Sequence, residues 1–155
     1  MTDQHRLDLE FMAAAIEEAR QGLAEGGIPI GSVLVVEGKI IGRGHNRRVQ
    51  QGNPILHGEM DAFQNAGRQP ATVYTQATLY STLSPCSMCG GTAVLYKIPR
   101  VVIGVNRTVA DTTLCEDWLR AHGIEVVNLD LPECYDLMQT FIQRHPEVWN
   151  EDIGY

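Results

Sequence analysis

Apolar residues follow a helical repeat in the first part of the chain. An apolar position recurs at every fourth residue, which predicts an amphipathic helix with this stripe buried. We expect Asp3 to cap the start of the helix and Gly26-Gly27 to end it. The stripe consists of Leu7, Phe11, Ala15, Ala19 and Leu23, widened by Met12 and Ile16.

After this helix the apolar pattern becomes that of strands. The run 32–36, the turn 37–39 and the pair 40–41 predict an antiparallel hairpin. Strand and helix patterns then alternate, which implies parallel strands joined by right-handed crossovers. Further helices are predicted at 57–66, 86–96, 114–121 and 131–144, the last stopped by Pro146, and further strands at 78–83, 100–105 and 124–129. The expected fold class is α/β, a three-layer α/β/α sandwich with a mixed five-stranded sheet.

Composition sets the broad class of protein. With 155 residues the chain suits one domain, 1–155, that buries roughly 70% of its unfolded surface. Its 44% hydrophobic and 20% charged residues are ordinary for a soluble globular protein. The first residues include Asp3 and contain no apolar run of signal-peptide length. We therefore expect a cytoplasmic protein without a membrane partner, whose cysteines stay reduced.

The charge balance argues against a nucleic-acid partner. The chain has 12 Lys and Arg against 19 Asp and Glu, a formal net charge of -7 and an isoelectric point near 5.1. A nucleic-acid backbone requires a basic binding surface, which this composition does not favour. Arg43, Arg47 and Arg48 form a local basic cluster, and we interpret them as solvated loop residues.

Two short motifs carry candidate metal chemistry. His57-Gly58-Glu59 and the stretch 85–89 (PCSMC) match the H-x-E and P-C-x-x-C signature of zinc-dependent nucleobase deaminases. Catalytic zinc takes three protein ligands and keeps its fourth position open, and His57, Cys86 and Cys89 supply three. One helical turn aims both sulfurs at one point, and a helix N-terminus lowers thiol pKa. Zinc lowers the pKa of bound water to about 7, and Glu59 is expected to move protons to and from that water.

Other interpretations of these residues stay open. A Cys-x-x-Cys at a helix start is also typical of a thioredoxin-like redox pair, and a structural zinc site is a further alternative, but neither explains the His-x-Glu motif. Cys115 and Cys134 lack metal-ligand spacing and are expected to be buried apolar fillers. Asp61 is expected to be structural or solvated. Asn46 has an alternative role as a turn residue, and Trp149 as an anchor for the C-terminal tail.

Longer stretches make the resemblance more specific. They are 25–31 (EGGIPIG), 42–46 (GRGHN), 56–59 (LHGE), 82–86 (TLSPC) and 149–154 (WNEDIG). With these, the chain resembles the fungal-type, zinc-dependent cytosine deaminases of the cytidine-deaminase-like superfamily over nearly its whole length. The zinc motif alone fits the whole superfamily, whereas His-Gly-Glu together with the Asp-Ile-Gly tail narrows the resemblance to the fungal-type cytosine deaminases.

This resemblance implies a set of site residues and partners. It implies a homodimer, a free-base substrate, one catalytic zinc per chain and Glu59 as the catalytic proton shuttle. It also implies a C-terminal lid, 146–155. The implied substrate-binding residues are Asn46, whose amide reads the ring; Gly58, whose N–H binds the ring carbonyl; Ser84, whose carbonyl faces the departing amine; Trp149 and Asp152 of the lid; and Ile30 and Val109.

Two of these residues bear on substrate choice. Asp152 can accept a hydrogen bond from a ring N–H that a free base has and a nucleoside lacks, so we expect it to discriminate between them. Val109 stands where the family has a phenylalanine over the substrate, and the missing aromatic wall opens room for a different or larger ring.

The expected function is hydrolytic deamination of cytosine to uracil and ammonia in pyrimidine salvage, with zinc-bound hydroxide attacking C4. One alternative is another free aminated heterocycle, such as guanine or a substituted pyrimidine. A nucleic-acid editing deaminase is a weaker alternative because of the acidic charge.

Overall fold

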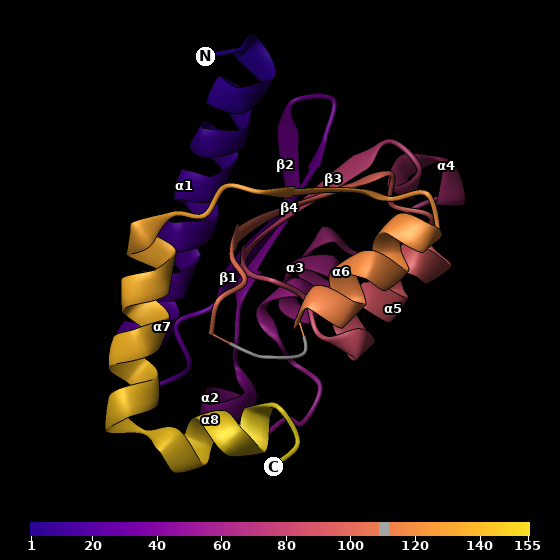
Figure 1. Cartoon of the computed structure of the whole chain (residues 1–155). Coiled ribbons are helices and arrows are strands. Elements are labelled where there is room, and N and C mark those ends of the chain that lie inside the picture. Colours follow the sequence, from indigo (N-terminus) through magenta and orange to yellow (C-terminus); the bar gives the residue numbers. More distant parts are fainter. Residues whose placement is uncertain (109–111) are drawn as a thin grey trace.

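The computed structural model describes residues 1–108 and 112–155, with side chains excepted at 112–114, and these residues form a five-stranded sheet between helices (Figure 1). The strands are β1 Gly31–Val36, β2 Lys39–His45, β3 Ala77–Leu83, β4 Arg100–Val105 and β5 Glu125–Asn128. Their order in the sheet is β2-β1-β3-β4-β5. β1 is antiparallel to both β2 and β3, whereas β3, β4 and β5 are parallel. The predicted mixed sheet is confirmed.

Helices cover both faces of this sheet. They are α1 Asp3–Ala24, α2 Arg48–Gln51, α3 Gly58–Ala66, α4 Ala71–Tyr74, α5 Ser87–Leu95, α6 Thr112–Ala121, α7 Pro132–Arg144 and α8 Pro146–Asp152. α1 and α7 pack on one face, and α3, α5 and α6 pack on the other (Figure 1). Because both faces are covered, the central strands β1, β3 and β4 are buried on both sides, which explains their mostly apolar sequences.

Alternate side chains of the central strands enter two separate cores. On β1, Val33 and Val35 pack in the core beneath α1 and α7, whereas Leu34 packs in the core beneath α3, α5 and α6. Tyr80 and Leu79 of β3 divide in the same way. This division follows from the two-residue period of a strand.

The first helix differs from its prediction. Thr2, not Asp3, is the N-cap, because its side chain accepts a hydrogen bond from the His5 N–H at 3.1 Å. Leu7 and Leu23 were expected to be buried, but they are 38% and 42% exposed. A four-residue repeat drifts by about 40° per step around a 3.6-residue helix, so the two ends of the stripe rotate out of the core.

Two glycines allow α3 to lie close against β2. A Cβ at Gly42 would lie 2.3 Å from the Ala62 carbonyl oxygen, and one at Gly44 would lie 2.5 Å from Asp61 Oδ2. The same glycines weakened the strand pattern, so only 40–41 was predicted, whereas β2 extends to His45. The close approach of α3 brings the helix start that carries the H-x-E motif towards the end of β2.

The C-terminal segment forms a helix of its own. α7 ends at Arg144, as predicted, and Pro146 then occupies the first turn of α8, where its missing N–H leaves no hydrogen bond unmade. α2 and α4 were not predicted either, and all three are short. Within the described residues, no helix is both long and apolar enough to cross a membrane.

Candidate active site

Three side chains from two helix starts converge on one point. His57 is the N-cap of α3, Cys86 is the N-cap of α5, and Cys89 lies in the first turn of α5. His57 Nδ1 lies 3.4 Å from Cys86 Sγ and 3.7 Å from Cys89 Sγ, and the three ligand atoms lie within 4.8 Å of one another. Tetrahedral zinc with bonds of ordinary length separates a nitrogen from a sulfur ligand by about 3.6 Å. The three groups therefore fit a zinc ion.

The second nitrogen of the His57 ring faces a carboxylate. His57 Nε2 lies 3.5 Å from Asp152 Oδ1. Metal-binding histidines commonly direct their other ring N–H to a carboxylate, which fixes the tautomer and the orientation of the ring. Asp152 is thus placed to hold His57 with Nδ1 towards the two sulfurs.

The pKa values of the three groups differ. The hydrogen bond with Cys89 and then that with His57 outweigh burial and lower the pKa of Cys86 to about 4. Burial would lower the pKa of His57, but Cys86 and the carboxylates of Asp152 and Glu59 raise it to about 9. The hydrogen bond to Cys86, together with burial, raises the pKa of Cys89 well above its ordinary value. Cys86 is therefore a thiolate at neutral pH, which is the form that binds metal.

Glu59 lies beside these groups in the first turn of α3. Its side chain is buried, and Ser81 Oγ donates a hydrogen bond to Glu59 Oε1 at 2.9 Å. Burial raises the pKa of Glu59; the Cys86 thiolate adds to this effect, and His57 opposes it. A carboxyl group that is held in place and faces a cavity can exchange protons with a ligand there.

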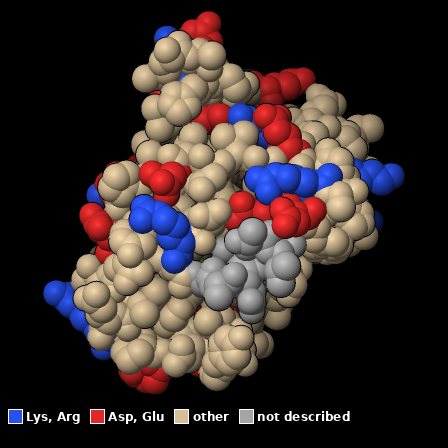
Figure 2. Space-filling view, viewed as in Figure 1, with Lys and Arg blue, Asp and Glu red and all other residues tan. Residues whose placement is uncertain are grey.

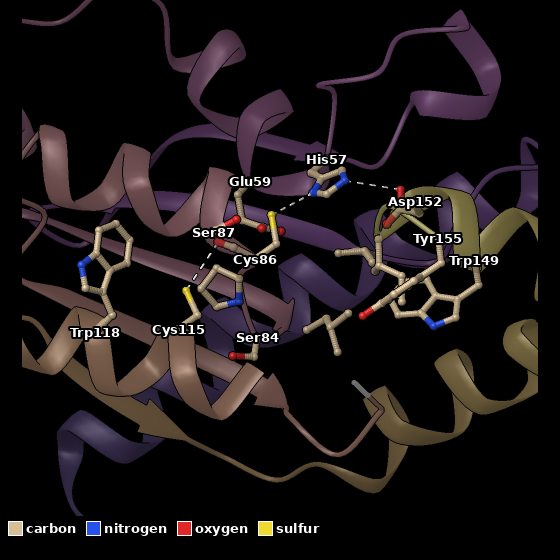
Figure 3. Close-up of a pocket in the computed structure, with 14 residues that line it drawn as sticks. His57, Glu59, Ser84, Cys86, Ser87, Cys115, Trp118, Trp149, Asp152 and Tyr155 are labelled. Atoms are coloured by element: carbon tan, nitrogen blue, oxygen red, sulfur yellow. Dashed lines mark hydrogen bonds and ion pairs between the residues drawn. The ribbon is translucent and has the colours of Figure 1, made fainter. Parts of the chain in front are cut away.

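A cavity of about 520 Å³ opens over the candidate metal site (Figure 3). In this view Asp152, Trp149 and Tyr155 lie to one side of Cys86, and Trp118 and Cys115 lie to the other. The cavity therefore extends from the C-terminal helix α8 to α6. Of the residues predicted from the sequence, Ile30, His57, Glu59, Ser84, Cys86, Trp149 and Asp152 line it.

The other predicted site residues do not line the cavity or are not described. Asn46 is fully buried behind Asp152, and its Nδ2 donates to Asp152 Oδ1 at 3.1 Å. Asn46 Oδ1 accepts from the backbone N–H two residues further on, so the turn role proposed for Asn46 is present. Gly58 packs against Ile30, since a Cβ there would lie 3.1 Å from the Ile30 carbonyl oxygen. Val109 lies outside the described residues.

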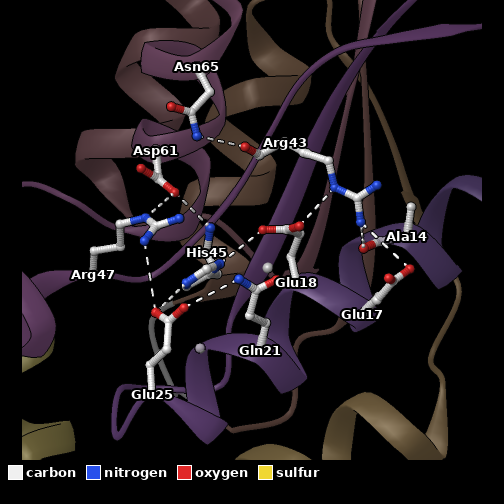
Figure 4. Close-up of polar contacts among 12 residues, drawn as sticks. Ala14, Glu17, Glu18, Gln21, Glu25, Arg43, His45, Arg47, Asp61 and Asn65 are labelled. Carbon is white, nitrogen blue, oxygen red and sulfur yellow. Dashed lines mark hydrogen bonds and ion pairs between the residues drawn. The ribbon is translucent and has the colours of Figure 1, made fainter.

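A cluster of polar and charged side chains surrounds His45, at the end of β2 (Figure 4). His45 is fully buried, with Nδ1 2.9 Å from Glu18 Oε1 and Nε2 2.8 Å from Glu25 Oε1. Asp61 accepts hydrogen bonds from the His45 N–H at 3.0 Å and from Arg47 Nε at 2.9 Å. Asp61 is therefore structural, and the solvated alternative is wrong. The cluster joins α1, the end of β2 and α3.

The interpretation of the three arginines as solvated loop residues is wrong for Arg47 and Arg48, whose side chains are 27% and 10% exposed, whereas Arg43 is exposed but lies in β2. Each guanidinium pairs with a carboxylate that lies at least 14 positions away in the sequence, so local composition could not reveal it. The pairs are Arg43 with Glu18, Arg47 with Asp61, and Arg48 with Glu151 and Asp152.

Two cysteines outside the motif have different environments. Cys134 is buried in the core, as predicted for an apolar filler. Cys115 is half-buried and lines the cavity, where its Sγ lies 3.5 Å from the Cys86 carbonyl oxygen. Trp118 and Tyr155 also line the cavity, and neither was predicted from the sequence. Trp118 follows Cys115 by one helical turn, so the two side chains share a helix face, and this spacing was the signal in the sequence that could have placed Trp118 near Cys115.

Comparison with known proteins supports the same class of site. Residues 5–105 match the family described as the cytidine and deoxycytidylate deaminase zinc-binding region. A cytosine deaminase of Candida albicans is 47% identical over 148 residues, which are 95% of this chain and 97% of that protein. A tRNA-specific adenosine deaminase of Streptococcus pyogenes is 36% identical over 88% of this chain and 91% of that protein. A solved tRNA deaminase of A-to-I editing at the wobble position has a TM-score of 0.71 and 27% identity, over 83% of this chain and 99% of that one.

The layered mixed sheet and the His-Cys-Cys group at two helix starts define a zinc-dependent deaminase fold. The chain belongs to the cytidine and deoxycytidylate deaminase zinc-binding family. It is a hydrolytic aminohydrolase with zinc as its cofactor, and a redox pair is not needed to explain its cysteines.

Proposed function

We propose that the protein converts cytosine and water to uracil and ammonia, and that the free base is its substrate. The carrying observation is the placement of Asp152 at the edge of the cavity. All of its polar contacts with described residues use Oδ1, so Oδ2 is left to accept from a ligand. Cytosine has a ring N–H at the position where a nucleoside carries its sugar, and this N–H matches such an acceptor. The similarity to the Candida albicans cytosine deaminase supports the same substrate.

The proposed reaction assigns each polar group of the cavity one task. His57, Cys86 and Cys89 would hold the zinc ion, which would act as a Lewis acid and lower the pKa of a bound water to about 7. Glu59 takes both protons of the attacking water in turn, passing the first to the ring nitrogen next to C4 and the second to the leaving amine. The net change is the replacement of the C4 amine by oxygen, with release of ammonia.

The remaining residues bind and orient the ring in this proposal. The Gly58 N–H binds the ring carbonyl and Asp152 Oδ2 accepts from the ring N–H, while Asn46, which does not line the cavity, orients Asp152 through its hydrogen bond to Oδ1. The Ser84 carbonyl faces the departing amine, because Ser84 lines the cavity beside Cys86. Ile30 and Trp149 form apolar walls, and Val109 is proposed to add to them. Residues 146–155 act as a lid, since Trp149, Asp152 and Tyr155 all line the cavity.

We propose a free base rather than nucleic acid because of charge. The chain carries 12 basic against 19 acidic residues, and on the face shown in Figure 2 acidic side chains lie beside most of the basic ones. A phosphate backbone favours a continuous basic surface. We further propose that the protein is a single-domain enzyme, 1–155, that serves pyrimidine salvage in the cytoplasm.

We also propose a homodimer. The end of α5 and the neighbouring α6 expose large apolar side chains, with exposed fractions of 69% for Leu95, 41% for Tyr96 and 39% for Trp118. Large apolar side chains exposed on two neighbouring helices favour association. Sedimentation of the purified protein tests this directly: a dimer that Leu95→Asp dissociates supports the proposal, and a monomer at micromolar concentration contradicts it.

The function is tested by ammonia release from separate substrates. The zinc-loaded protein is incubated with cytosine, cytidine, guanine and adenine, with Glu59→Gln as the matched inactive control. The proposal predicts release from cytosine alone. Release from cytidine at a comparable rate would remove Asp152 as the discriminating group, and release from guanine or adenine with cytosine inert would replace the substrate while keeping the class of reaction.

A further inference from the structure

Arg48 contacts Asp152, which is proposed to accept a hydrogen bond from the ring N–H of a free base, and Asn46, which is bonded to Asp152. Its backbone N–H donates to Asn46 Oδ1 at 3.0 Å, so Asn46 Nδ2 is turned towards Asp152. Its side-chain Nη1 lies 3.4 Å from Asp152 Oδ1. One residue at the start of α2 therefore fixes the orientation of an amide and holds one oxygen of a carboxylate on α8.

The guanidinium of Arg48 is fully engaged. Its Nε donates to the Pro54 carbonyl oxygen at 2.9 Å. Nη1 and Nη2 make a two-point contact with the Glu151 carboxylate at 2.9 and 2.5 Å. The Arg48 side chain is only 10% exposed, although Glu151 is 66% exposed. Because the side chain is nine-tenths buried and its Nε is bound to the Pro54 carbonyl oxygen, the guanidinium has little freedom to leave Asp152 even without the Glu151 contact.

The contacts on Asp152 all fall on the same oxygen. Asn46 Nδ2, Arg48 Nη1 and His57 Nε2 lie 3.1, 3.4 and 3.5 Å from Oδ1. Oδ2 has no partner among the described residues, and Asp152 lines the cavity. Holding one oxygen from three directions prevents rotation of the carboxylate, which leaves the other oxygen at a fixed position for a ligand N–H.

From this arrangement, and resting on the proposed free-base function, we propose that Arg48 is a positioning residue for substrate specificity. It acts through Asp152 and Asn46, and it makes the cavity selective for rings that carry an N–H at the position where a nucleoside carries its sugar. Without the guanidinium, the Asp152 carboxylate can rotate, and a ligand with the N–H loses its prearranged acceptor. A ligand with a methyl group at this position never made that hydrogen bond and is affected little.

A purely structural role for Arg48 predicts a different result. If Arg48 only fastened α8 to the body of the protein, its loss would weaken every ligand of the cavity to the same extent. Glu151→Gln is the matched control, because it removes the charge from the exposed partner of Arg48 but leaves the contact with Asp152. The ratio of the affinities for a ligand with the ring N–H and a ligand without it therefore distinguishes a positioning role of Arg48 from a purely structural one.

The test uses two probes that cannot be deaminated and that differ from each other in one group. Pyrimidin-2-one has the ring N–H and carbonyl of cytosine without the amine, and 1-methylpyrimidin-2-one lacks the N–H. Calorimetric titration of each into the zinc-loaded wild type, Arg48→Gln, Arg48→Lys and Glu151→Gln gives the ratio of their dissociation constants. Zinc content and thermal midpoint are measured for each variant, and Arg48→Lys carries the comparison if Arg48→Gln does not fold.

We expect the wild type to prefer pyrimidin-2-one by at least about 100-fold, because sites built around a ligand N–H strongly reject analogues that lack it. Arg48→Gln should reduce this preference by about 10- to 100-fold, which is the usual effect of losing a hydrogen bond to a charged group. The preference of Arg48→Lys should lie between those of the wild type and Arg48→Gln. The preference of Glu151→Gln should stay within about threefold of the wild-type value.

Three results would overturn the inference: no preference in the wild type, equal weakening of both probes in the Arg48 variants, or an equal loss of preference in Glu151→Gln. The proposed function fails separately. If cytosine is not deaminated but the preference for the N–H probe depends on Arg48, the inference stands and the reaction does not. If cytosine is deaminated but the preference for the N–H probe does not change in the Arg48 variants, the proposed function stands and the inference about Arg48 fails.

Discussion

The buried carboxylate of Asp8 should be a principal source of stability in α1. Asp8 is only 2% exposed, and its two oxygens accept hydrogen bonds from Arg100 Nη1 and Nη2, both at 2.7 Å. Tyr80 Oη and Gln4 Nε2 also donate to Asp8 Oδ1, at 2.8 and 3.0 Å. Asp8→Asn preserves the size of the side chain but leaves the Arg100 cation without its main counter-charge.

The magnitude follows from the burial of both partners. Breaking a buried ion pair by removing one charge costs about 3–5 kcal/mol. Arg100 is 15% exposed and keeps a contact with Glu125 at 3.2 Å, which favours the lower end. A loss of about 3 kcal/mol corresponds to a fall in thermal midpoint of about 6–12 °C for a chain of this length.

The effect should also depend on pH. Burial would raise the pKa of Asp8, but the hydrogen bonds from Arg100, Tyr80 and Gln4 outweigh it and hold the pKa below the ordinary value of 3.8. A lowered pKa in the folded state means that the stabilisation is present above the unfolded pKa and is lost as pH falls through the folded value. The difference between wild type and Asp8→Asn should therefore stay constant from pH 7 to about 5 and shrink below about 4.

Urea unfolding at a series of pH values measures this difference. Asp3→Asn is the matched control, because Asp3 pairs with Arg6 on the surface, with side chains that are 93% and 61% exposed. Its loss should cost less than about 0.5 kcal/mol. A change below about 1 kcal/mol for Asp8→Asn at pH 7, or a difference that grows as pH falls towards 3, would refute the reasoning.

Three further substitutions test the site and its support. Glu59→Gln should keep bound zinc and the thermal midpoint but lose about 10²- to 10⁴-fold in turnover, and near-normal turnover would remove Glu59 as the proton shuttle. Cys86→Ala should purify with little zinc and unfold at lower urea concentration, because zinc binding is coupled to folding; a fully metallated variant would show that Cys86 is not a ligand. Gly44→Ala should destabilise the protein by about 1–3 kcal/mol, because the new Cβ would lie 2.5 Å from Asp61 Oδ2, and an unchanged urea midpoint would contradict that close packing.

Features that depend on nearby residues could be predicted from the sequence. The metal ligands lie in two short motifs, and each motif sits at a helix start that its own residues indicate. The central strands were recognised because burial on both faces gives runs of apolar residues, as in β4. The parallel pairing of β3, β4 and β5 followed from the alternation of helix and strand patterns.

Features that depend on distant partners could not be predicted. Asp8 replaces Leu7 on the buried face of α1 because Arg100, 92 positions away, neutralises it. Arg48 finds its partners 103 and 104 positions further along, so its role is invisible in local composition. The far wall of the cavity at Trp118 also depends on how α6 packs against α5. Tertiary pairing, not local propensity, decides all three.

The central claim is a zinc-dependent conversion of cytosine to uracil in this cavity. Its most direct test is the rate of uracil formation from cytosine as zinc is added stepwise to the metal-free protein. The rate should rise in proportion to bound zinc and level off at one zinc per chain, with one ammonia released for each uracil. Uracil formation without zinc, or none at one zinc per chain, would contradict it.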